Sequence, residues 1–374
     1  MDFTLSDEQE MLRNGLTKFL STRYGLERSR TAAKTGAGWQ PDIWRAFADE
    51  LGILGAALPE EVGGIGGGPV EVMVIAEALG HALVVEPYVD TAVVSAGLLV
   101  RAGGKRASAL LELVAAGHAI VALAAGEAQS GDRWQDVATT ARRDGAEWVL
   151  TGSKTMAVSA PLATHLLVSA RTEHGPSLFL VDVAAVASGL EMHAYRTVDD
   201  RRAADLLLAE LRLPADALLG EEGQAWPSLA HARDEGATAV CAEAVGGMRK
   251  VLSDTVEYCK QRQQFGQPIG SFQVLQHRMV DMHMELEQSV AAVYLAVLNL
   301  EADATTRARA VSAAKATIGR AARFIGQNAV QLHGGMGMTE ELAIGHYFKR
   351  LTAVQYEFGS TDDHVARYAE LTRG

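Results

Sequence analysis

Two segments in the last third of the sequence carry side chains that could hold a ligand with phosphate and planar-ring groups. The first, Gln261–Gln273, places a cation, two aromatic rings and several terminal amides between stretches typical of long helices. Arg262 can pair with a phosphate, Phe265 can stack on a planar ring, and Gln273 can hydrogen-bond a polar edge. The same composition also suits a helix C-cap followed by a helix–helix packing loop. The spacing alone leaves both interpretations open.

The second segment is Gln331–Gly337, in which Gly334, Gly335 and Gly337 leave little side chain around the backbone. Consecutive glycines after a helical stretch normally form a cap. Their bare N–H groups can also approach a pyrophosphate closely. Taken alone, this segment favours the capping interpretation.

Signatures of the common catalytic sites are absent from the sequence. Neither Gly63–Gly68 nor Gly334–Gly337 completes a GxGxxG motif after a strand, and no GxxxxGK[ST] loop occurs. Ser130 and Ser159 lack the context of a nucleophile elbow. The histidines form no HExxH motif. We therefore expect neither a metal site nor a serine hydrolase site.

The overall composition indicates a globular protein of more than one domain, with 374 residues, 48% hydrophobic and 21% charged. The net charge of −12 disfavours wrapping nucleic acid or an anionic membrane. No apolar run approaches the roughly 18–20 residues that span a bilayer, and Met1–Glu10 is too polar for a signal peptide. Two cysteines, Cys241 and Cys259, are best read as small buried hydrophobic residues. We expect a cytoplasmic protein with no nucleic-acid partner and no membrane contact.

The elements that must position the two segments follow a helical, then β, then helical order. Ser6 and Gln9 predict a capping box, after which apolar residues recur at helical spacing. Further helices are expected over Ile43–Leu51 and over Val70–Gly80, the latter just after Pro69.

The middle of the chain changes to β patterns. Val137–Arg142 and Trp148–Leu150 flank Asp144-Gly145, which is a strong hairpin signal. Leu166–Ala170 and Leu178–Val183 flank a second turn. These patterns predict a small sheet or barrel.

Long helical runs return over Asp234–Gln264, Gln276–Ala302 and Thr306–Leu332, which predicts a helical bundle. The expected fold class is α+β. The expected domains are an N-terminal helical domain over 1–118, a central β-barrel-like domain over 119–222 and a C-terminal helical bundle over 223–374.

Together these segments resemble the acyl-CoA dehydrogenase family. The family's Arg-x-x-Phe-Gly-x-x-Ile-x-x-Phe-Gln segment is matched from Arg262 to Gln273, and its Gln-x-x-Gly-Gly-x-Gly segment from Gln331 to Gly337. The resemblance spans essentially the whole chain in the family's order. Further matches are Glu50–Leu54, Pro59–Gly64, Gly152–Lys154 and Pro214–Gly220.

A narrower resemblance is to the small subunit of pimeloyl-CoA dehydrogenase. Its marks are Gly63–Glu71, Ser271–Arg278 and His346–Thr352. Members of this branch are often one half of a heteromeric enzyme. The resemblance therefore implies either a homo-oligomer or a heteromer with a homologous large subunit.

The family resemblance implies FAD-dependent α,β-desaturation of an acyl-CoA thioester, in fatty acid or dicarboxylate catabolism. A carboxylate removes the α proton while the β-carbon gives a hydride to the flavin, and hydrogen bonds must polarise the thioester carbonyl. The reduced flavin would pass electrons to an electron-transfer flavoprotein. Residues near the first segment would contact FAD from one subunit, and those near the second from its neighbour. The FAD-binding residues that the resemblance implies are Arg262, Phe265, Phe272, Gln273, Gln331, Leu332, His333, Gly334 and Gly335.

The sequence departs from the family at the catalytic carboxylate, which should stand directly before the glycine of a Glu-Gly-Thr segment. Gly359 matches that glycine, Phe358 occupies the preceding position, and Glu357 lies one residue away. Glu357 is the best candidate base, although in an extended backbone such a shift reverses the side-chain direction. A solvated loop carboxylate is the alternative interpretation of Glu357.

Other departures concern a second base position and the β domain. The alternative family base would fall near Gly236, where Asp234 and Glu235 are the neighbouring carboxylates. The family's Trp-Ile-Thr, which lies against the flavin, is replaced by Met156–Val158, and its Thr-Glu-Pro loop is represented loosely by Gly126–Asp132.

Three functions follow from these features. The leading prediction is a FAD-dependent acyl-CoA dehydrogenase with Glu357 as its base. The alternative is a non-catalytic, FAD-binding subunit of a heteromeric acyl-CoA dehydrogenase, which the displaced carboxylate favours. A flavin oxidase or monooxygenase on the same fold is the third.

Overall fold

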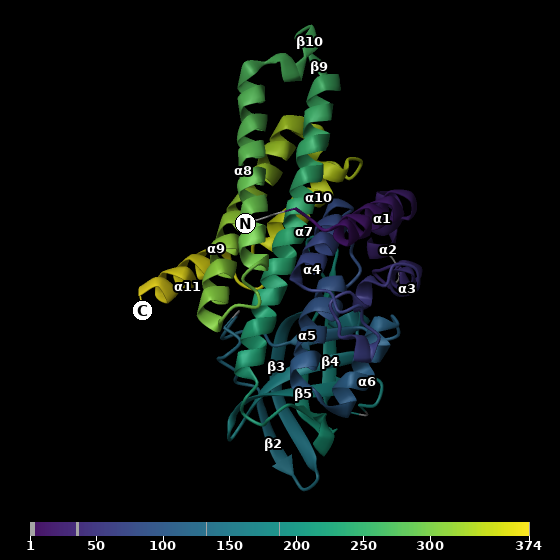
Figure 1. Cartoon of the computed structure of the whole chain (residues 1–374), viewed down its shortest axis with the longest axis vertical. Coiled ribbons are helices and arrows are strands. Elements are labelled where there is room, and N and C mark those ends of the chain that lie inside the picture. The colour runs from purple at the N-terminus through teal and green to yellow at the C-terminus, as the bar shows by residue number, and fades with distance from the viewer. Residues whose placement is uncertain (1–3, 35–36, 132, 187, 374) are drawn as a thin grey trace. The chain divides into compact units, whose positions relative to one another are not determined.

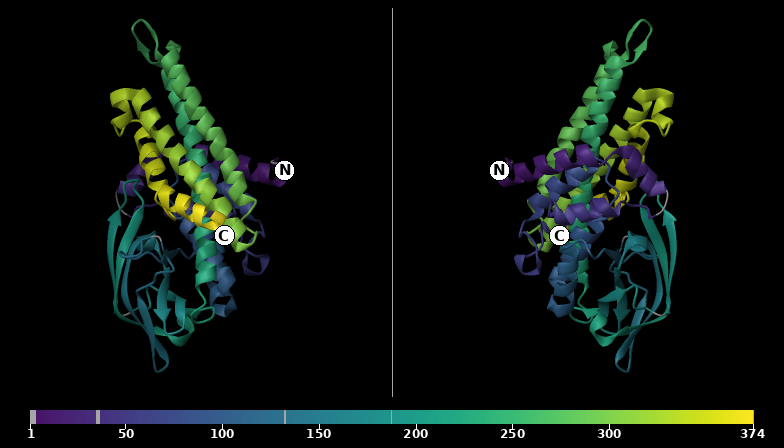
Figure 2. Two further views of the ribbon diagram at one scale, coloured as in Figure 1. Left: turned by 90° about the vertical axis from the view of Figure 1, so that its left-hand side faces the viewer. Right: turned by 90° about the vertical axis from the view of Figure 1, so that its right-hand side faces the viewer.

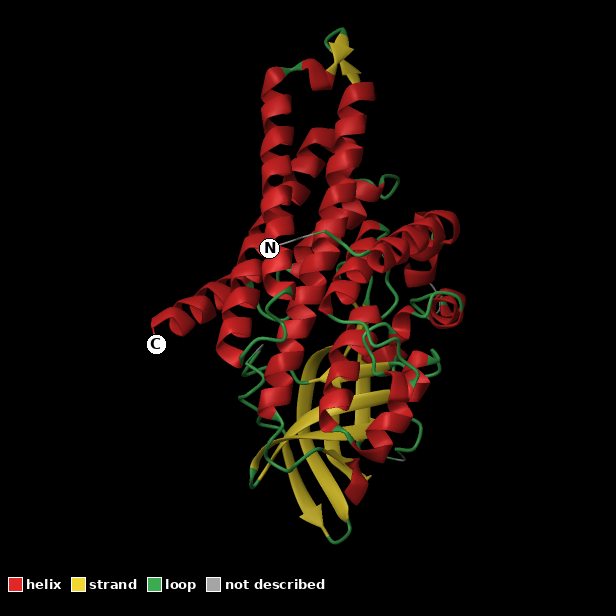
Figure 3. Cartoon of the chain, in the orientation of Figure 1, coloured by secondary structure: helices red, strands yellow, loops and turns green. Residues whose placement is uncertain are grey.

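Helices occupy both ends of the chain and strands occupy most of its middle (Figure 3). The computed structural model describes residues 4–34, 37–131, 133–186 and 188–373. The chain divides into two compact units. The helical unit comprises 1–29, 69–84 and 237–374, and the sheet unit comprises 30–68 and 85–236. The three domains with boundaries at 118 and 222 stay a prediction.

The first helix, α1 (Asp7–Arg23), begins at the predicted capping box. Ser6 Oγ accepts a hydrogen bond from the backbone N–H of Gln9 at 3.2 Å, and Gln9 Oε1 accepts one from the N–H of Ser6 at 3.0 Å. These two contacts satisfy donors that a helix start otherwise leaves unpaired. The following helices are α2 (Leu26–Lys34), α3 (Pro41–Asp49), α4 (Pro69–His81), α5 (Ala96–Ala102) and α6 (Gly104–Ala115), with a π-helix over Val89–Ser95.

The three long C-terminal helices are confirmed, with different ends. They are α7 (Trp226–Gln261), α8 (Gln273–Val297) and α9 (Ala304–His333). The predicted end of α7 at Gln264 is wrong, because β9 (Gln263–Gln264) and β10 (Gln267–Pro268) pair as a small antiparallel hairpin between α7 and α8 (Figures 1 and 2). Two shorter helices, α10 (Ala343–Val354) and α11 (Thr361–Arg373), follow α9.

Within the helical unit, α4 approaches α7 at a pair of glycines. A Cβ on Gly80 would lie 1.9 Å from the carbonyl oxygen of Glu243, and a Cβ on Gly246 would lie 1.9 Å from that of Glu77. Only glycine allows two helix backbones to come this close. The crossing therefore fixes the backbone of Glu243, which carries a side chain of the candidate site.

In the sheet unit, the described strands form one sheet in the order β6-β7-β3-β2-β4-β5-β8, with β1 pairing β4 in parallel. Both predicted hairpins are confirmed: β2 (Thr140–Asp144) pairs β3 (Glu147–Val158), and β4 (His165–Thr172) pairs β5 (Gly175–Asp182). Gly145 supplies the positive φ of the first turn. The remaining strands are β1 (Val121–Ala124), β6 (Leu190–Arg196), β7 (Arg202–Pro214) and β8 (Leu218–Leu219).

Three further observations concern the described part of the chain. No described helix is both long and apolar enough to cross a membrane. Among the same residues, no group of three or more His, Cys, Asp or Glu side chains could hold a metal ion. Cys241 and Cys259 are both buried, as the sequence predicted.

Candidate functional site

The segment from Arg262 to Gln273 forms the tip of the α7–α8 pair (Figure 1). The two-residue turn between β9 and β10 has φ values of 55° at Phe265 and 78° at Gly266. Two positive φ values are the mark of a type I′ turn, whose first position normally holds Asn, Asp or Gly. A phenylalanine there adopts a strained backbone conformation.

The side chains of the tip face outward. Phe265 is 90% exposed and meets the ring of Phe272 edge-on, with centroids 6.1 Å apart. Arg262 and Gln273 are also exposed. The structure thus brings the four predicted residues of this segment to one tip. They combine a cation, an amide and an aromatic face that is open for stacking.

The five predicted residues at the end of α9 divide by burial. Gln331, Gly334 and Gly335 are exposed, and a Cβ added to either glycine would point into open space. Leu332 and His333 are buried instead. Gly334 is the C-cap residue with φ 61°, as the capping interpretation predicted. The N–H of Gly334 donates to the carbonyl oxygen of Gln331, so the exposed Gly335 is the glycine of this pair that a ligand could approach.

His333 connects this helix end to the first segment. Its ring stacks on Tyr258 with centroids 4.2 Å apart and an interplanar angle of 26°. Its Nδ1 lies 2.8 Å from the carbonyl oxygen of Ala329, so this nitrogen carries the proton. Tyr258 Oη donates in turn to the carbonyl oxygen of His333 at 3.4 Å. The imidazole therefore joins α9 to α7 and does not point outward.

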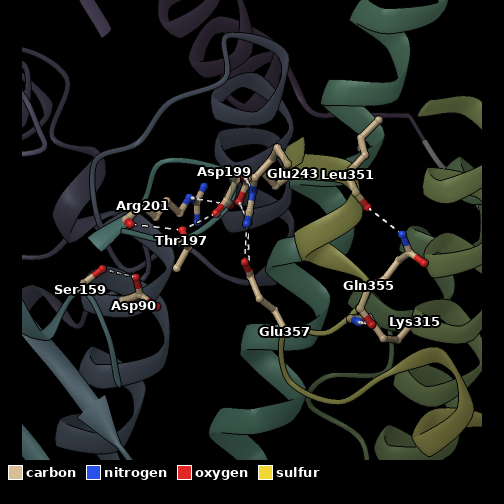
Figure 4. A network of polar contacts seen from close by, with 11 residues as sticks. Asp90, Ser159, Thr197, Asp199, Arg201, Glu243, Lys315, Leu351, Gln355 and Glu357 are labelled. Atoms are coloured by element: carbon tan, nitrogen blue, oxygen red, sulfur yellow. Dashed lines mark hydrogen bonds and ion pairs between the residues drawn. The ribbon is translucent and has the colours of Figure 1, made fainter. Parts of the chain in front are cut away.

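Glu357 lies in the loop between α10 and α11 (Figure 4). Its carboxylate is paired with Arg350. Both oxygens of Glu357 accept hydrogen bonds from the guanidinium, one from Nη1 and the other from Nη2 at 3.0 Å. The loop carboxylate is thus neither simply solvated nor free. Each oxygen keeps a second lone-pair site, so the carboxylate could still take a proton from a substrate while Arg350 holds its orientation.

Arg350 is shared with a second carboxylate from α7. Its Nε donates to Glu243 Oε1 at 2.7 Å, and its Nη2 donates to Glu243 Oε2 at 2.9 Å. Arg350 and Glu243 are only 5% and 4% exposed. We call this set of Glu243, Arg350 and Glu357 the arginine cluster. Removing the arginine would leave two carboxylates without their shared partner in a buried site.

The two carboxylates near the alternative base position, those of Asp234 and Glu235, are likewise buried or paired. Glu235 accepts two hydrogen bonds of 2.8 Å from Arg101 within the sheet unit. Asp234 is fully buried. All three carboxylates considered as bases are therefore either paired with arginine or sequestered.

The sequence reasoning missed Arg350 and Glu243, although one signal was available. Glu243 stands in the run Cys241-Ala-Glu-Ala-Val245, where a single charge interrupts small and apolar residues. A charge in such a run predicts a buried side chain with a partner. The partner itself lies far along the chain, so only the fold identifies it.

The loop that carries Glu357 is also held by its backbone. Lys315, on α9, is fully buried and donates to the carbonyl oxygen of Gln355 at 3.2 Å (Figure 4). It also donates to the carbonyl oxygen of Gly359 at 2.9 Å. His364, on α11, contacts the carbonyl oxygen of Phe358 at 2.9 Å through Nε2. Phe358 itself has φ 57°.

Two departures noted in the β domain have a clear local structure. Met156 has φ 54° and is half exposed, and its N–H donates to Asp205, which also accepts from Tyr195 Oη. Asp132 of the Gly126–Asp132 loop lies outside the described residues.

Glu127 of that loop is buried and accepts from Lys154 Nζ at 2.6 Å. Its two oxygens also accept from the N–H groups of Ala138 and Thr139, at 2.8 and 3.0 Å. Burial alone would raise the pKa of Glu127. The hydrogen bond and charge of Lys154, with these N–H donors, outweigh burial and lower that pKa to about 2.

Comparison with known proteins gives matches along nearly the whole chain. Family models match in order: acyl-CoA dehydrogenase N-terminal domain over residues 6–116, middle domain over 122–212 and C-terminal domain over 224–370. Acyl-CoA dehydrogenase FadE12 of Mycobacterium tuberculosis is 31% identical over 360 residues, covering 91% of this chain and 90% of FadE12.

Solved structures match over the full length as well. In the ChsE4–ChsE5 complex from Mycobacterium tuberculosis, the matched chain is 26% identical with a TM-score of 0.91, covering 100% of this chain and 99% of that one. A glutaryl-CoA dehydrogenase from Mycobacterium smegmatis, solved in complex with FADH2, shares the fold with a TM-score of 0.90 at 24% identity, covering 98% of this chain and 95% of that one.

Proposed function

The chain belongs to the acyl-CoA dehydrogenase family, whose members are oxidoreductases, and from that premise we propose its particular reaction. We propose that it takes part in FAD-dependent α,β-dehydrogenation of an acyl-CoA thioester. Reduced flavin would then pass its electrons to an electron-transfer flavoprotein. Acyl-CoA is therefore the proposed substrate, and FAD is the proposed cofactor.

The observation that carries this proposal is the exposed, strained Phe265 at the tip of α7 and α8. A strained turn that holds an aromatic ring in solvent lowers the stability of the fold unless the ring contacts a ligand or a partner. Arg262 and Gln273 beside it fit the phosphates and the polar edges of FAD. The exposed backbone at Gly335 fits the close approach of a pyrophosphate.

FAD, when bound, supplies the hydride acceptor. In the proposed site Arg262, Phe265, Phe272 and Gln273 of one subunit and the exposed residues at the end of α9 of its neighbour would hold it. Leu332 and His333 would act only through the backbone of that helix end, because their side chains are buried. The proposed assembly is therefore a homo-oligomer or a heteromer with a homologous large subunit.

In the leading form of the proposal, Glu357 takes the α proton of the thioester at a carboxylate oxygen. It would do so at a lone-pair site that Arg350 does not occupy, while Glu243 keeps the guanidinium in place. The test is anaerobic bleaching of the flavin absorbance by a panel of acyl-CoAs. We expect bleaching in the wild type and in the exposed control Glu287→Gln, and none in Glu357→Gln.

A second candidate function is favoured by the carboxylates themselves. Glu357 and Glu235 are paired with arginines and Asp234 is buried, which suits a subunit that binds FAD while a partner provides the base. This form predicts FAD binding without bleaching by any thioester. It also predicts bleaching after reconstitution with a base-bearing homologue, unchanged by Glu357→Gln. A homo-oligomer that is active alone would exclude it.

A further inference from the structure

We infer that Lys315 and His364 are positioning residues for the loop from Gln355 to Ser360. By holding the loop carbonyls, they keep Phe358 in the left-handed backbone conformation and thereby set the directions of Glu357 and Phe358. The inference rests on the proposed function only for its kinetic consequence, since the conformational part concerns the loop itself.

Lys315 acts on both ends of the loop. Its ammonium group donates to the carbonyl oxygens of Gln355 and Gly359, at 3.2 and 2.9 Å. Lys315 is fully buried. A lysine is almost never fully buried unless specific partners compensate its desolvation. Two of its partners are backbone oxygens at the two ends of one loop, so the ammonium group holds that loop against α9.

His364 acts on the middle of the loop. Its Nε2 is 2.9 Å from the carbonyl oxygen of Phe358, and its Nδ1 is 3.2 Å from Ser312 Oγ. A carbonyl oxygen only accepts, so Nε2 carries the proton, and in the neutral ring Nδ1 accepts from the serine. His364 is fully buried. A chain of hydrogen bonds therefore runs from Ser312 on α9 through His364 to the carbonyl oxygen of Phe358, the residue with the strained backbone.

The conformation that these contacts maintain is unfavourable for the residue present. Phe358 has φ 57° and Gly359 has φ 109°. A glycine takes such values freely, whereas a phenylalanine pays a conformational cost. Such strain persists only where the surroundings over-determine the backbone. Three of the loop's carbonyl oxygens, those of residues 355, 358 and 359, are bound by the two positioning residues.

The left-handed conformation matters because Glu357 and Phe358 are neighbours. A change of φ and ψ at residue 358 redirects the two side chains relative to α10 and α11. The arginine cluster fixes the carboxylate of Glu357 on one side, and the two positioning residues fix the backbone on the other. Loss of either positioning residue should therefore misplace groups without removing them.

The first test is a double-mutant cycle that needs no activity. Lys315→Met is introduced into the wild type and into Phe358→Gly, and the unfolding equilibrium constant is measured in denaturant. With Phe358, a loop released by Lys315→Met can relax and recover its strain energy, which offsets part of the lost contacts, whereas glycine has no strain to recover. We therefore expect the effect of Lys315→Met on that constant to be at least about fivefold larger in the Phe358→Gly background. Equal effects in both backgrounds would overturn the conformational inference.

The second test separates positioning from general loss of structure. The rate constant of flavin reduction at saturating acyl-CoA, the half-saturating concentration and the FAD content are compared in His364→Leu, His364→Gln and the control Ile325→Val. Gln can donate from a position near that of Nε2, whereas Leu cannot. Ile325 is buried on α9, between two and three turns from Lys315.

We expect His364→Leu to reduce the rate constant by about tenfold, which is about 1.4 kcal/mol of barrier, with half-saturation and FAD content unchanged. His364→Gln should recover most of the rate, and Ile325→Val should match the wild type. The positioning role would be refuted if His364→Gln reduced flavin no faster than His364→Leu. It would also be refuted if Ile325→Val lost as much of the rate constant as His364→Leu.

The two ideas fail in distinguishable ways. A wild-type flavin that no thioester reduces, alone or with a base-bearing partner, would reject the proposed function. The double-mutant cycle would still decide whether Lys315 holds the strained loop. Conversely, an enzyme that reduces its flavin with acyl-CoA would support the proposed function. Equal effects of Lys315→Met in the wild-type and Phe358→Gly backgrounds would then reject the inference about the loop alone.

Discussion

Two phenylalanines of the helical unit have nearly the same strained backbone, and their surroundings differ completely. Phe265 has φ 55° and is 90% exposed at the tip of α7 and α8. Phe358 has φ 57° in a loop whose carbonyl oxygens are bound by the buried side chains of Lys315 and His364. The tip is held by a short turn and offers its side chains outward, whereas the loop is fixed from within.

The difference indicates two uses of the same strain. Beyond its edge contact with Phe272, the exposed ring of Phe265 contributes little to folding, so its face remains available for a contact outside the chain. A strained loop tied to buried groups is instead preorganised, and its energetic support is already present. Substitutions on the buried side and at the exposed tip should therefore differ in their effects on stability.

The largest effect is expected when the arginine cluster loses its centre. Arg350→Met leaves Glu243 and Glu357 without their shared guanidinium, which should lower the free energy of unfolding by about 3–5 kcal/mol. Denaturant unfolding measures this difference. The exposed Arg323→Met is the control and should change stability by less than about 0.5 kcal/mol. A loss below about 1 kcal/mol for Arg350→Met would contradict the described pairing.

The sheet unit offers a pH test of the same kind of buried support. The pKa of Glu127 is lowered from 4.5 to about 2 in the folded chain. A depressed carboxyl pKa adds stability that is full above the unfolded value and is lost as pH falls from about 4.5 towards 2. The unfolding free energy, measured over this range, should therefore fall more steeply in the wild type than in Glu127→Gln. Parallel pH profiles would disprove the role of Glu127.

A smaller effect is expected from a methyl group placed under the loop. A Cβ on Gly319 would lie 2.4 Å from Thr361 Oγ1, at the start of α11. Gly319→Ala should cost about 1–2 kcal/mol of unfolding free energy, because the threonine has to move. Gly335→Ala is the matched change just after α9, where the added Cβ would have no atom within 4 Å apart from those of its chain neighbours. It should be nearly neutral, and similar costs at both sites would remove the contrast between them.

The smallest change in stability is expected at the tip. Phe265→Asn introduces the residue type that a type I′ turn prefers, so the unfolding free energy should rise by about 0.5–1 kcal/mol. The same variant should retain less FAD after gel filtration, because the stacking ring is gone. Flavin absorbance per protein measures retention. Full retention of FAD would show that Phe265 is not part of the cofactor site.

The sequence predicted the order of elements well because long helices and hairpin turns carry strong local signals. The capping box at Ser6 and Gln9 and the turn at Gly145 are examples. It missed the β9–β10 hairpin, since strands of two residues show no period. It also extended α7 to Gln264, because glutamines suit a helix as well as a short strand.

The candidate site was predicted only where its residues are close in sequence. The tip from Arg262 to Gln273 is one continuous segment, and the structure brings its side chains together. The arginine cluster joins Glu243 to Arg350 and Glu357 across a large sequence separation. No local pattern specifies such a contact, because it depends on how α7 and α10 pack.

The glycine crossing of α4 and α7 has a consequence for divergence within this family. The arginine cluster is ionic, and buried ion pairs can be exchanged as a set for apolar side chains of similar volume. Gly80 and Gly246 have no such substitutes, since a single methyl at either would lie 1.9 Å from a backbone oxygen. As sequences drift, the two glycines should therefore outlast the charges beside them, and they mark this helix crossing more durably than Glu243 does.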